Sequence, residues 1–253
     1  MATTPLASTY FDFYPAPHHK RARLLDQSRG GQASKWLRWM RTNVLMPLNK
    51  IPVVSSSLVP PWIELPGDVT ANILQRLGAE EVLRSAQAVC TTCWKVSKDP
   101  LLWRVIDFSN PRQGLFNDEY NAMCRCAVDR SQGQLVDLTI QYFGDNALMD
   151  YVANRSPSLT RLKLGTCVFI SGYCAKRTVA KLRQLEELHL TLRPWIGAVQ
   201  IQDIGYSCPL LKSFSCNGLK CKLRRYEDII HNDRFRNAYA LAISKSMPNL
   251  KNV

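Results

Sequence analysis

The chain has 253 residues, of which 46% are hydrophobic and 21% are charged, so its composition is that of a globular protein and excludes a largely disordered one. It has no run of about 18 apolar residues and no basic start followed by an apolar core, so neither a membrane-spanning helix nor a secretory signal is expected. The net charge of +13 is spread as +6 over residues 1–57, −1 over 58–107 and +8 over the remainder, without basic and aromatic residues interleaved, so nucleic-acid binding is not expected.

Residues 1–57 are predicted to be a disordered basic tail and linker, because they show no sustained hydrophobic period. Within them, Lys20-Arg21-Ala22-Arg23 has the composition of a nuclear-import patch, although runs this short are common. Residues 35–41 place two Trp among basic residues, as a membrane-surface helix does. They cover only about two helical turns. A helix that packs on a partner is therefore the favoured interpretation, and membrane binding is not expected.

Residues 61–104 are predicted to form short helices with more apolar side chains than they can bury among themselves. Pro66 suits the first turn of a helix, since it has no N–H to leave unpaired. Gly78 is expected to end this helix, and a second one is predicted from Glu80 to Trp94. The excess apolar surface favours burial against a partner, although a small helical domain with its own core is the alternative.

This stretch resembles the F-box. The residues that carry the resemblance are Leu65-Pro66, Ile73-Leu74, Leu77, Val82-Leu83, Val89-Cys90, Trp94 and Pro100-Leu-Leu-Trp103. It departs from the family pattern at Gly67-Asp68, where many members have an acidic residue directly after Leu-Pro. The resemblance implies docking onto the Skp-type adaptor of a cullin–RING ubiquitin ligase. The adaptor-binding residues that it implies are Leu65, Pro66, Ile73, Leu74, Leu77, Leu83, Val89 and Trp94.

We place the F-box at 58–105, a connecting segment at 106–134 and a repeat region at 135–253. A helix is predicted over Asn117–Val128, ending before Gly133. From Leu135 a phrase Leu-x-x-Leu-x-Leu recurs, and its starting positions step by 24, 26, 26 and 39 residues. The first three steps lie in the range of leucine-rich repeats, in which each phrase is a short strand.

The turns between repeats have their own mark. Pro157, Pro209 and Pro248 each lie two residues before the first apolar residue of a repeat, where Pro ends the preceding helix. The long step indicates an insertion near residues 218–236, either a tolerated surface loop or a binding element. The chain stops at Val253 without a polar cap, which predicts a truncated or shortened member.

The Cys-Pro-x-Leu form at 208–211 resembles the cysteine-containing class of leucine-rich repeats, which commonly accompanies F-boxes, notably in plants. The chain is therefore identified as resembling the F-box/leucine-rich-repeat family. The implied fold is a helical F-box followed by an α/β solenoid of short parallel strands with helices, curved, with about four repeats and the last incomplete.

No motif predicts catalysis, a cofactor or a metal site. Cys90-Thr-Thr-Cys93 has metal-site spacing, but no second pair with suitable spacing follows. Nine cysteines without framework spacing fit reduced thiols in an intracellular protein, nuclear or cytoplasmic. We find no phosphate loop, nucleophile elbow or zinc-protease motif.

The resemblance implies a non-catalytic substrate-recognition subunit of an SCF-type (Skp–cullin–F-box) ligase, joined through the adaptor to a cullin and a RING subunit. An unknown protein substrate would bind the polar strand residues that alternate with the buried leucines. These are Asp137, Thr139, Gln141, Arg161, Lys163, Glu187, His189, Ser213, Ser215 and Asn217. A protein-interaction scaffold without ligase output, or a module that binds an anionic ligand, remains open. Salt dependence separates the last of these, because phosphate binding weakens steeply with salt.

Overall fold

A computed structural model describes residues 65–111, 117–167, 169–192, 196–218 and 233–251. All of them belong to one compact unit, Met46–Val253. The predicted basic tail with its two basic segments, and most of the predicted insertion at 218–236, lie outside the described residues.

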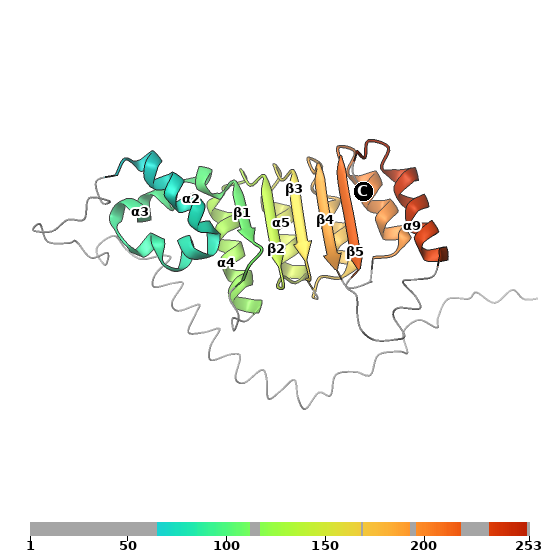
Figure 1. The fold of residues 1–253 in the computed structure, drawn as a ribbon, viewed down its shortest axis with the longest axis horizontal. Helices are drawn as coiled ribbons and strands as arrows, with labels where there is room; N and C mark the ends of the chain where they lie inside the picture. Colours follow the sequence, from blue (N-terminus) through green and yellow to red (C-terminus); the bar gives the residue numbers. More distant parts are fainter. Residues whose placement is uncertain (1–64, 112–116, 168, 193–195, 219–232, 252–253) are drawn as a thin grey trace, which may run out of the picture. The chain divides into compact units, whose positions relative to one another are not determined.

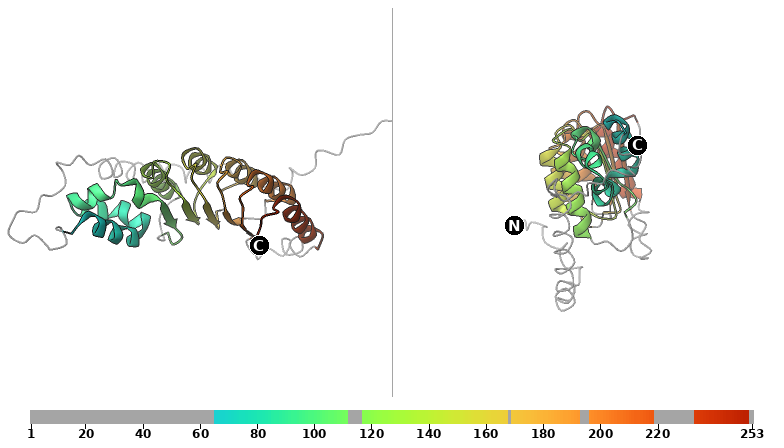
Figure 2. Two further views of the ribbon diagram at one scale, coloured as in Figure 1. Left: turned by 90° about the horizontal axis from the view of Figure 1, so that it is seen from above. Right: turned by 90° about the vertical axis from the view of Figure 1, so that its left-hand side faces the viewer.

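Five parallel strands form a single sheet in the order β1-β2-β3-β4-β5 (Figure 1). The strands are β1 Val105–Phe108, β2 Asp137–Gln141, β3 Arg161–Gly165, β4 Glu187–Leu192 and β5 Ser213–Gly218. The helices that follow them are α4 Asn117–Arg130, α5 Asn146–Arg155, α6 Gly172–Val179, α7 Ala198–Ser207 and α9 Asp233–Ser246. These helices cover one face of the sheet, and no described helix covers the other face (Figure 2).

The core lies between the sheet and these helices. Along each strand, residues alternate between the core and the uncovered face, as the two-residue period of a strand requires. The second and third apolar positions of the predicted phrase are buried, for example Leu162 and Leu164 in β3. The leading leucines Leu135, Leu159 and Leu185 are also fully buried. The α/β repeat fold predicted from the phrase is confirmed.

The backbone repeats the same contact at each step of the sheet. The residue before each strand donates its N–H to the carbonyl of the equivalent residue of the preceding repeat, as in Thr160 to Val136 at 3.0 Å and Lys212 to Glu186 at 2.8 Å. Lys251 donates in the same way to Lys212 at 2.8 Å. The 39-residue step therefore returns the chain to register, and Lys251 stands where a further strand begins.

The array begins one unit earlier than the sequence analysis placed it. The segment expected to be a connector contributes β1, which pairs in parallel with β2, and α4, which matches the helix predicted there. Trp103, Ile106 and Phe108 occupy the three apolar positions of the phrase and are 1%, 0% and 2% exposed. Because none of them is leucine, the leucine-based pattern did not detect this first strand.

The helical segment before β1 is more broken than predicted. Helix α2, Gly67–Arg84, contains Gly78 at φ 81°, so the predicted break at this glycine is confirmed. The single helix predicted from Glu80 to Trp94 is wrong. It is divided into the end of α2, the 3₁₀ turn η3 Ala86–Ala88 and helix α3 Thr91–Val96.

Capping explains the second of these breaks. Cys90 has an extended backbone, and its Sγ accepts the N–H of Cys93 at 3.3 Å. A residue in this conformation caps the N-terminus of a helix, so it cannot continue the preceding one. The final turn, η4 Pro100–Trp103, leads directly into β1, and Asp99 caps it through Leu101 N–H.

A buried arginine joins this helical segment to the array. Arg130, near the end of α4, donates to Gln87 Oε1 at 2.7 Å and to the Ser97 carbonyl at 3.2 Å. Its guanidinium carbon lies 5.2 Å from the ring centroid of Trp103, whose Nε1 also donates to Ser97 O. Burial, and then the charge of Arg130, lower the pKa of Lys98 to about 8.

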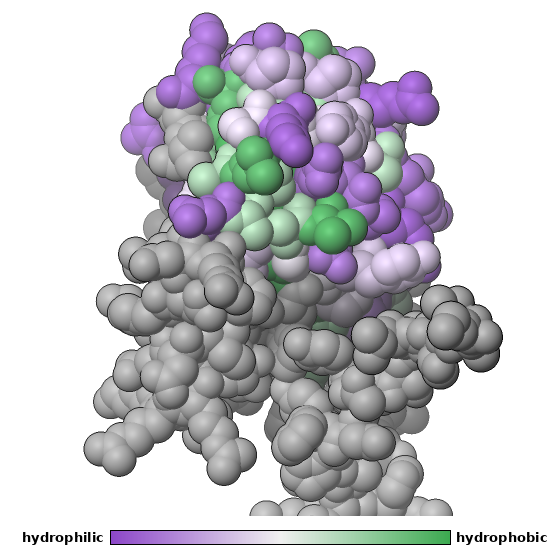
Figure 3. All heavy atoms as spheres, turned by 90° about the vertical axis from the view of Figure 1, so that its right-hand side faces the viewer, coloured by the Kyte–Doolittle hydropathy of each residue, from purple (hydrophilic) through white to green (hydrophobic). Residues whose placement is uncertain are grey.

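At the other end of the array, α9 packs on α7. Gly205 of α7 faces Ser246 and Met247, and a Cβ added to Gly205 would lie 2.2 Å from Ser246 Oγ. The glycine therefore permits the close approach of the two helices. Viewed from this end, apolar side chains are interspersed with hydrophilic ones on the described surface (Figure 3).

Candidate protein-binding surfaces

Helix α2 presents a row of exposed apolar side chains. Val69, Ile73 and Leu77 are 41%, 45% and 47% exposed. They are spaced by four residues, so they lie on one side of the helix. Large apolar groups gathered on one side of a surface helix indicate a surface that another molecule covers.

The other predicted adaptor-binding residues divide into two groups. Pro66 and Val89 are exposed, and Leu65 and Trp94 are half-buried. Leu74 and Leu83 are only 2% and 0% exposed, because they pack into the interior of the chain. In this structure their side chains contribute to the core and present almost no surface to an adaptor.

Trp94 has an unusual environment. Its indole Nε1 is buried and has no hydrogen-bond partner among the described residues. Lys98 Nζ lies 5.2 Å from the centroid of its ring. A buried donor without an acceptor is unfavourable by about 1–3 kcal/mol, so this indole is suited to a partner that supplies an acceptor.

The cysteine pair in this segment is structural. The capping contact between Cys90 and Cys93 accounts for their spacing. Burial, followed by the contact with Cys90, raises the pKa of Cys93 to about 11, so its thiol is protonated at neutral pH. No group of three or more potential ligands is found within the described ranges, so nothing there assembles a metal site.

The uncovered face of the sheet carries the predicted substrate-binding residues. Register places them in rows across the strands. One row runs Val105, Asp137, Arg161, Glu187, Ser213; the next runs Asp107, Thr139, Lys163, His189, Ser215; the third contains Gln141, Gly165, Thr191 and Asn217. The face is therefore polar and of mixed charge. Arg161 and Lys163 are exposed, and the other predicted members are half-buried, except that the side chain of Asn217 is outside the description.

The charges on this face are not equivalent. Arg161 Nε lies 3.1 Å from Asp137 Oδ2, and Glu187 is its partner on the other side. Lys163 has Thr139 and His189 as its neighbours in the row, and it forms no ion pair with any described residue. Lys163 is thus the cation of this face that has no carboxylate beside it.

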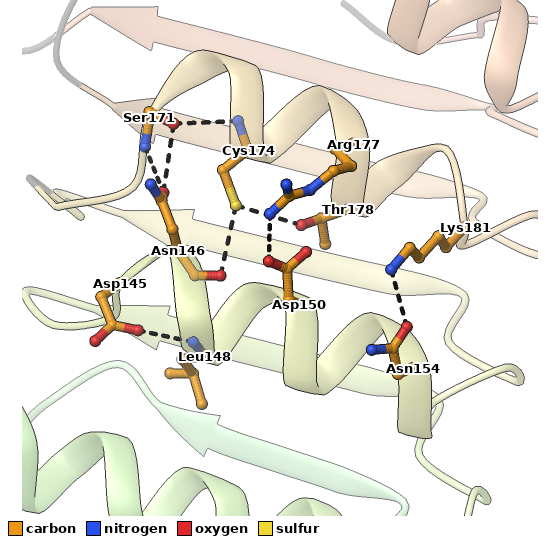
Figure 4. Close-up of polar contacts among 10 residues, drawn as sticks. All are labelled: Asp145, Asn146, Leu148, Asp150, Asn154, Ser171, Cys174, Arg177, Thr178 and Lys181. Atoms are coloured by element: carbon orange, nitrogen blue, oxygen red, sulfur yellow. Dashed lines mark hydrogen bonds and ion pairs between the residues drawn. The ribbon is translucent and has the colours of Figure 1, made fainter.

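The opposite layer uses its charges to join successive helices (Figure 4). Arg177 of α6 pairs with Asp150 of α5, and Lys181 Nζ donates to Asn154 Oδ1 at 2.9 Å. Asn146 Oδ1 accepts the N–H of Ser171 at 2.9 Å. Part of the net positive charge is therefore engaged within the helix layer.

Comparison with known proteins agrees with this architecture. No protein-family model matches the chain. F-box/LRR-repeat protein 9 of Arabidopsis thaliana is 34% identical, and the match covers 76% of this chain and 75% of that protein. The chain belongs to the F-box/leucine-rich-repeat family.

Two further relatives are longer than this chain. F-box/LRR-repeat protein 23 and F-box protein SKIP19, both of Arabidopsis thaliana, are 34% and 40% identical over 96% and 76% of the chain. The matches cover 57% and 59% of those proteins, so the chain spans less than two thirds of their length. The plant F-box/leucine-rich-repeat resemblance inferred from the motifs is confirmed.

The F-box of this chain contains features that sequence reasoning missed. Val69 belongs to the apolar row of α2, and its spacing from Ile73 and Leu77 could have revealed it. The orphaned indole N–H of Trp94 and the Arg130 junction depend on tertiary contacts and have no sequence signal. Within the residues described, no helix is both long and apolar enough to cross a membrane.

Proposed function

We propose that the chain is a substrate-recognition subunit of an SCF-type ubiquitin ligase. In this account the F-box binds a Skp-type adaptor, which links it to a cullin and a RING subunit. The polar face of the sheet binds a protein substrate. The chain itself supplies no catalytic group, and it accelerates ubiquitin transfer by holding the substrate close to the catalytic subunits.

The apolar row of α2 is the observation that carries this proposal. Val69, Ile73 and Leu77 lie in the F-box and are left exposed by the rest of the described chain. Stable protein interfaces are centred on large apolar anchors that become fully desolvated in the complex. Pro66, Val89 and Trp94 supply further apolar surface, and Trp94 also supplies an N–H without an acceptor.

Burial changes the set of adaptor-binding residues that we propose. Leu74 and Leu83 are assigned to the internal core, and Val69 is added to the exposed set. The proposed contact residues are Leu65, Pro66, Val69, Ile73, Leu77, Val89 and Trp94.

The test is assembly of the complete ligase. The full chain would be co-expressed with a Skp-type adaptor, a cullin and a RING subunit, and separated by size exclusion in about 0.5 M salt, where exposed charge contacts are largely screened. We expect the wild-type chain to co-elute with all three proteins. The Ile73→Glu/Leu77→Glu variant should elute alone, because two charges would be buried in an apolar interface without partners.

A matched control uses an exposed apolar residue of the repeat helices. Val199 of α7 is 67% exposed, and Val199→Glu should co-elute as the wild type does. Co-elution of the α2 double variant, or failure of the folded wild-type chain to join the adaptor, would contradict the proposal.

A further inference from the structure

A groove lies where the F-box meets the sheet. It has a volume of about 610 Å³ and is bounded by α2, η4 and β1. Leu74 and Val82 of α2 line it and are buried, whereas Leu101 and Val105 are 56% and 58% exposed at its margin. A volume of this size falls within the range of ligand-binding clefts, and its lining fits a large apolar side chain.

The groove is separate from the apolar row proposed to bind the adaptor. Leu74 follows Ile73 by one residue, so the two side chains leave α2 about 100° apart. The groove also includes Val105 and Asp107 of β1, which lie outside the F-box helices. A partner in the groove therefore contacts the sheet as well as the F-box.

The groove continues directly onto the uncovered face of the sheet. Asp107 lines the groove and is also the first member of the row that crosses to Thr139 and Lys163. Asp107 Oδ1 accepts the Ser109 N–H at 2.7 Å, so its carboxylate is partly engaged locally. The next large charge along the row is Lys163.

Lys163 is complementary to an anionic side chain. Its neighbours in the row are Thr139 and His189, and it forms no ion pair with the residues that the structure describes. Arg161, two residues earlier, contacts Asp137 and faces Glu187, so its charge is already balanced. The face therefore offers one uncompensated positive charge beside an apolar groove.

The spacing of these two features defines the segment that fits them. Adjacent strands lie about 4.8 Å apart, so Lys163 is two strand steps, or roughly 10 Å, from Asp107. An extended or polyproline-like chain advances about 3.1–3.4 Å per residue. With the reach of the lysine side chain, two side chains separated by two to four positions can occupy both features.

We propose that the sheet face recognises an extended protein segment with a large apolar residue and, two to four positions away, an anionic residue. The apolar side chain occupies the groove and the anion contacts Lys163. The anion is a carboxylate of Asp or Glu or the phosphate of a modified residue. Reading this segment as part of a ubiquitination substrate rests on the proposed function.

The test is selection from a phage library of random dodecapeptides on the full chain without the adaptor. We expect enrichment of a large apolar residue with Asp or Glu at the stated spacing. Selection on Lys163→Glu should change the acidic preference to Lys or Arg, and Val105→Asp should remove the apolar preference. Peptides selected on the wild type should bind Lys163→Glu roughly tenfold more weakly, because like charges are then juxtaposed.

Lys181→Glu is the matched control, because Lys181 carries the same charge but contacts Asn154 in the helix layer (Figure 4). It should select the same peptides as the wild type. A synthetic copy of a selected peptide with phosphoserine at the acidic position then shows, by fluorescence anisotropy, whether carboxylate or phosphate binds more tightly.

Other outcomes overturn the inference. These are the absence of enriched peptides on the folded wild-type chain, a selection that neither Lys163→Glu nor Val105→Asp changes, or enrichment of this chain's own sequence, which would indicate a second copy. Loss of adaptor binding with selection intact would contradict only the proposed function. Intact adaptor binding without selection would contradict only this inference.

Discussion

Arg130 shows how much of this architecture depends on single side chains. It is 8% exposed, and neutral groups, Gln87 Oε1 and the Ser97 carbonyl, accept its hydrogen bonds. The aromatic ring of Trp103 covers part of its charge. These contacts tie the end of α4 to the F-box turns, so one arginine bridges the adaptor-binding and repeat parts of the chain.

Removal of this side chain should destabilise the fold. Arg130→Ala leaves the Gln87 acceptor unpaired and opens a cavity, so we expect the free energy of unfolding to fall by about 2–4 kcal/mol. Urea unfolding followed by circular dichroism measures this change. The control is Arg183→Ala, an exposed site expected to change stability by less than about 0.5 kcal/mol. Equal, small effects of both variants would show that the junction does not depend on Arg130.

At the scale of elements, the repeat phrase predicted four strands because its apolar positions recur at nearly constant spacing. β2 to β5 begin two residues after Leu135, Leu159, Leu185 and Leu211, respectively. The helix ends were also predictable, since α5, α7 and α9 stop two residues before Pro157, Pro209 and Pro248. Local chemistry alone determines these features.

Other elements could not be predicted in this way. β1 was missed because Trp103, Ile106 and Phe108 replace the leucines of the phrase. The helix expected to end at Trp94 broke at Cys90, since a capping contact outweighed an apolar period. The pairing of Arg177 with Asp150 joins residues on different helices, and nothing in local sequence indicates it.

The close contact of α7 and α9 gives a prediction at this scale. In Gly205→Ala the new methyl group would approach Ser246 Cβ to 2.6 Å and Met247 Cγ to 2.8 Å, so the helices must separate. We expect a loss of about 1–3 kcal/mol in unfolding free energy, with faster hydrogen exchange in α9. Gly67→Ala, where nothing lies within 4 Å, is the control. Unchanged exchange in α9 would contradict the predicted packing.

At the scale of the molecule, the chain has two surfaces of different chemistry. The exposed row on α2 is apolar, whereas the sheet face is polar with an apolar groove at one end. Sequence reasoning identified most of the exposed F-box residues and the strand residues of the sheet face. It did not separate Leu74 and Leu83 from the surface set or find the groove, because burial and cavities arise only when distant segments pack.

The most direct test of the central claim is calorimetric titration of a Skp-type adaptor into the purified chain in about 0.5 M salt, where charge contacts contribute little. For the wild type we predict one-to-one binding, and for Ile73→Glu a weakening of about a hundredfold, as expected for an interface anchor. Lys163→Glu, on the sheet face, should bind the adaptor as the wild type does. Equal affinity of the wild type and Ile73→Glu would show that the apolar row of α2 is not the adaptor-binding surface.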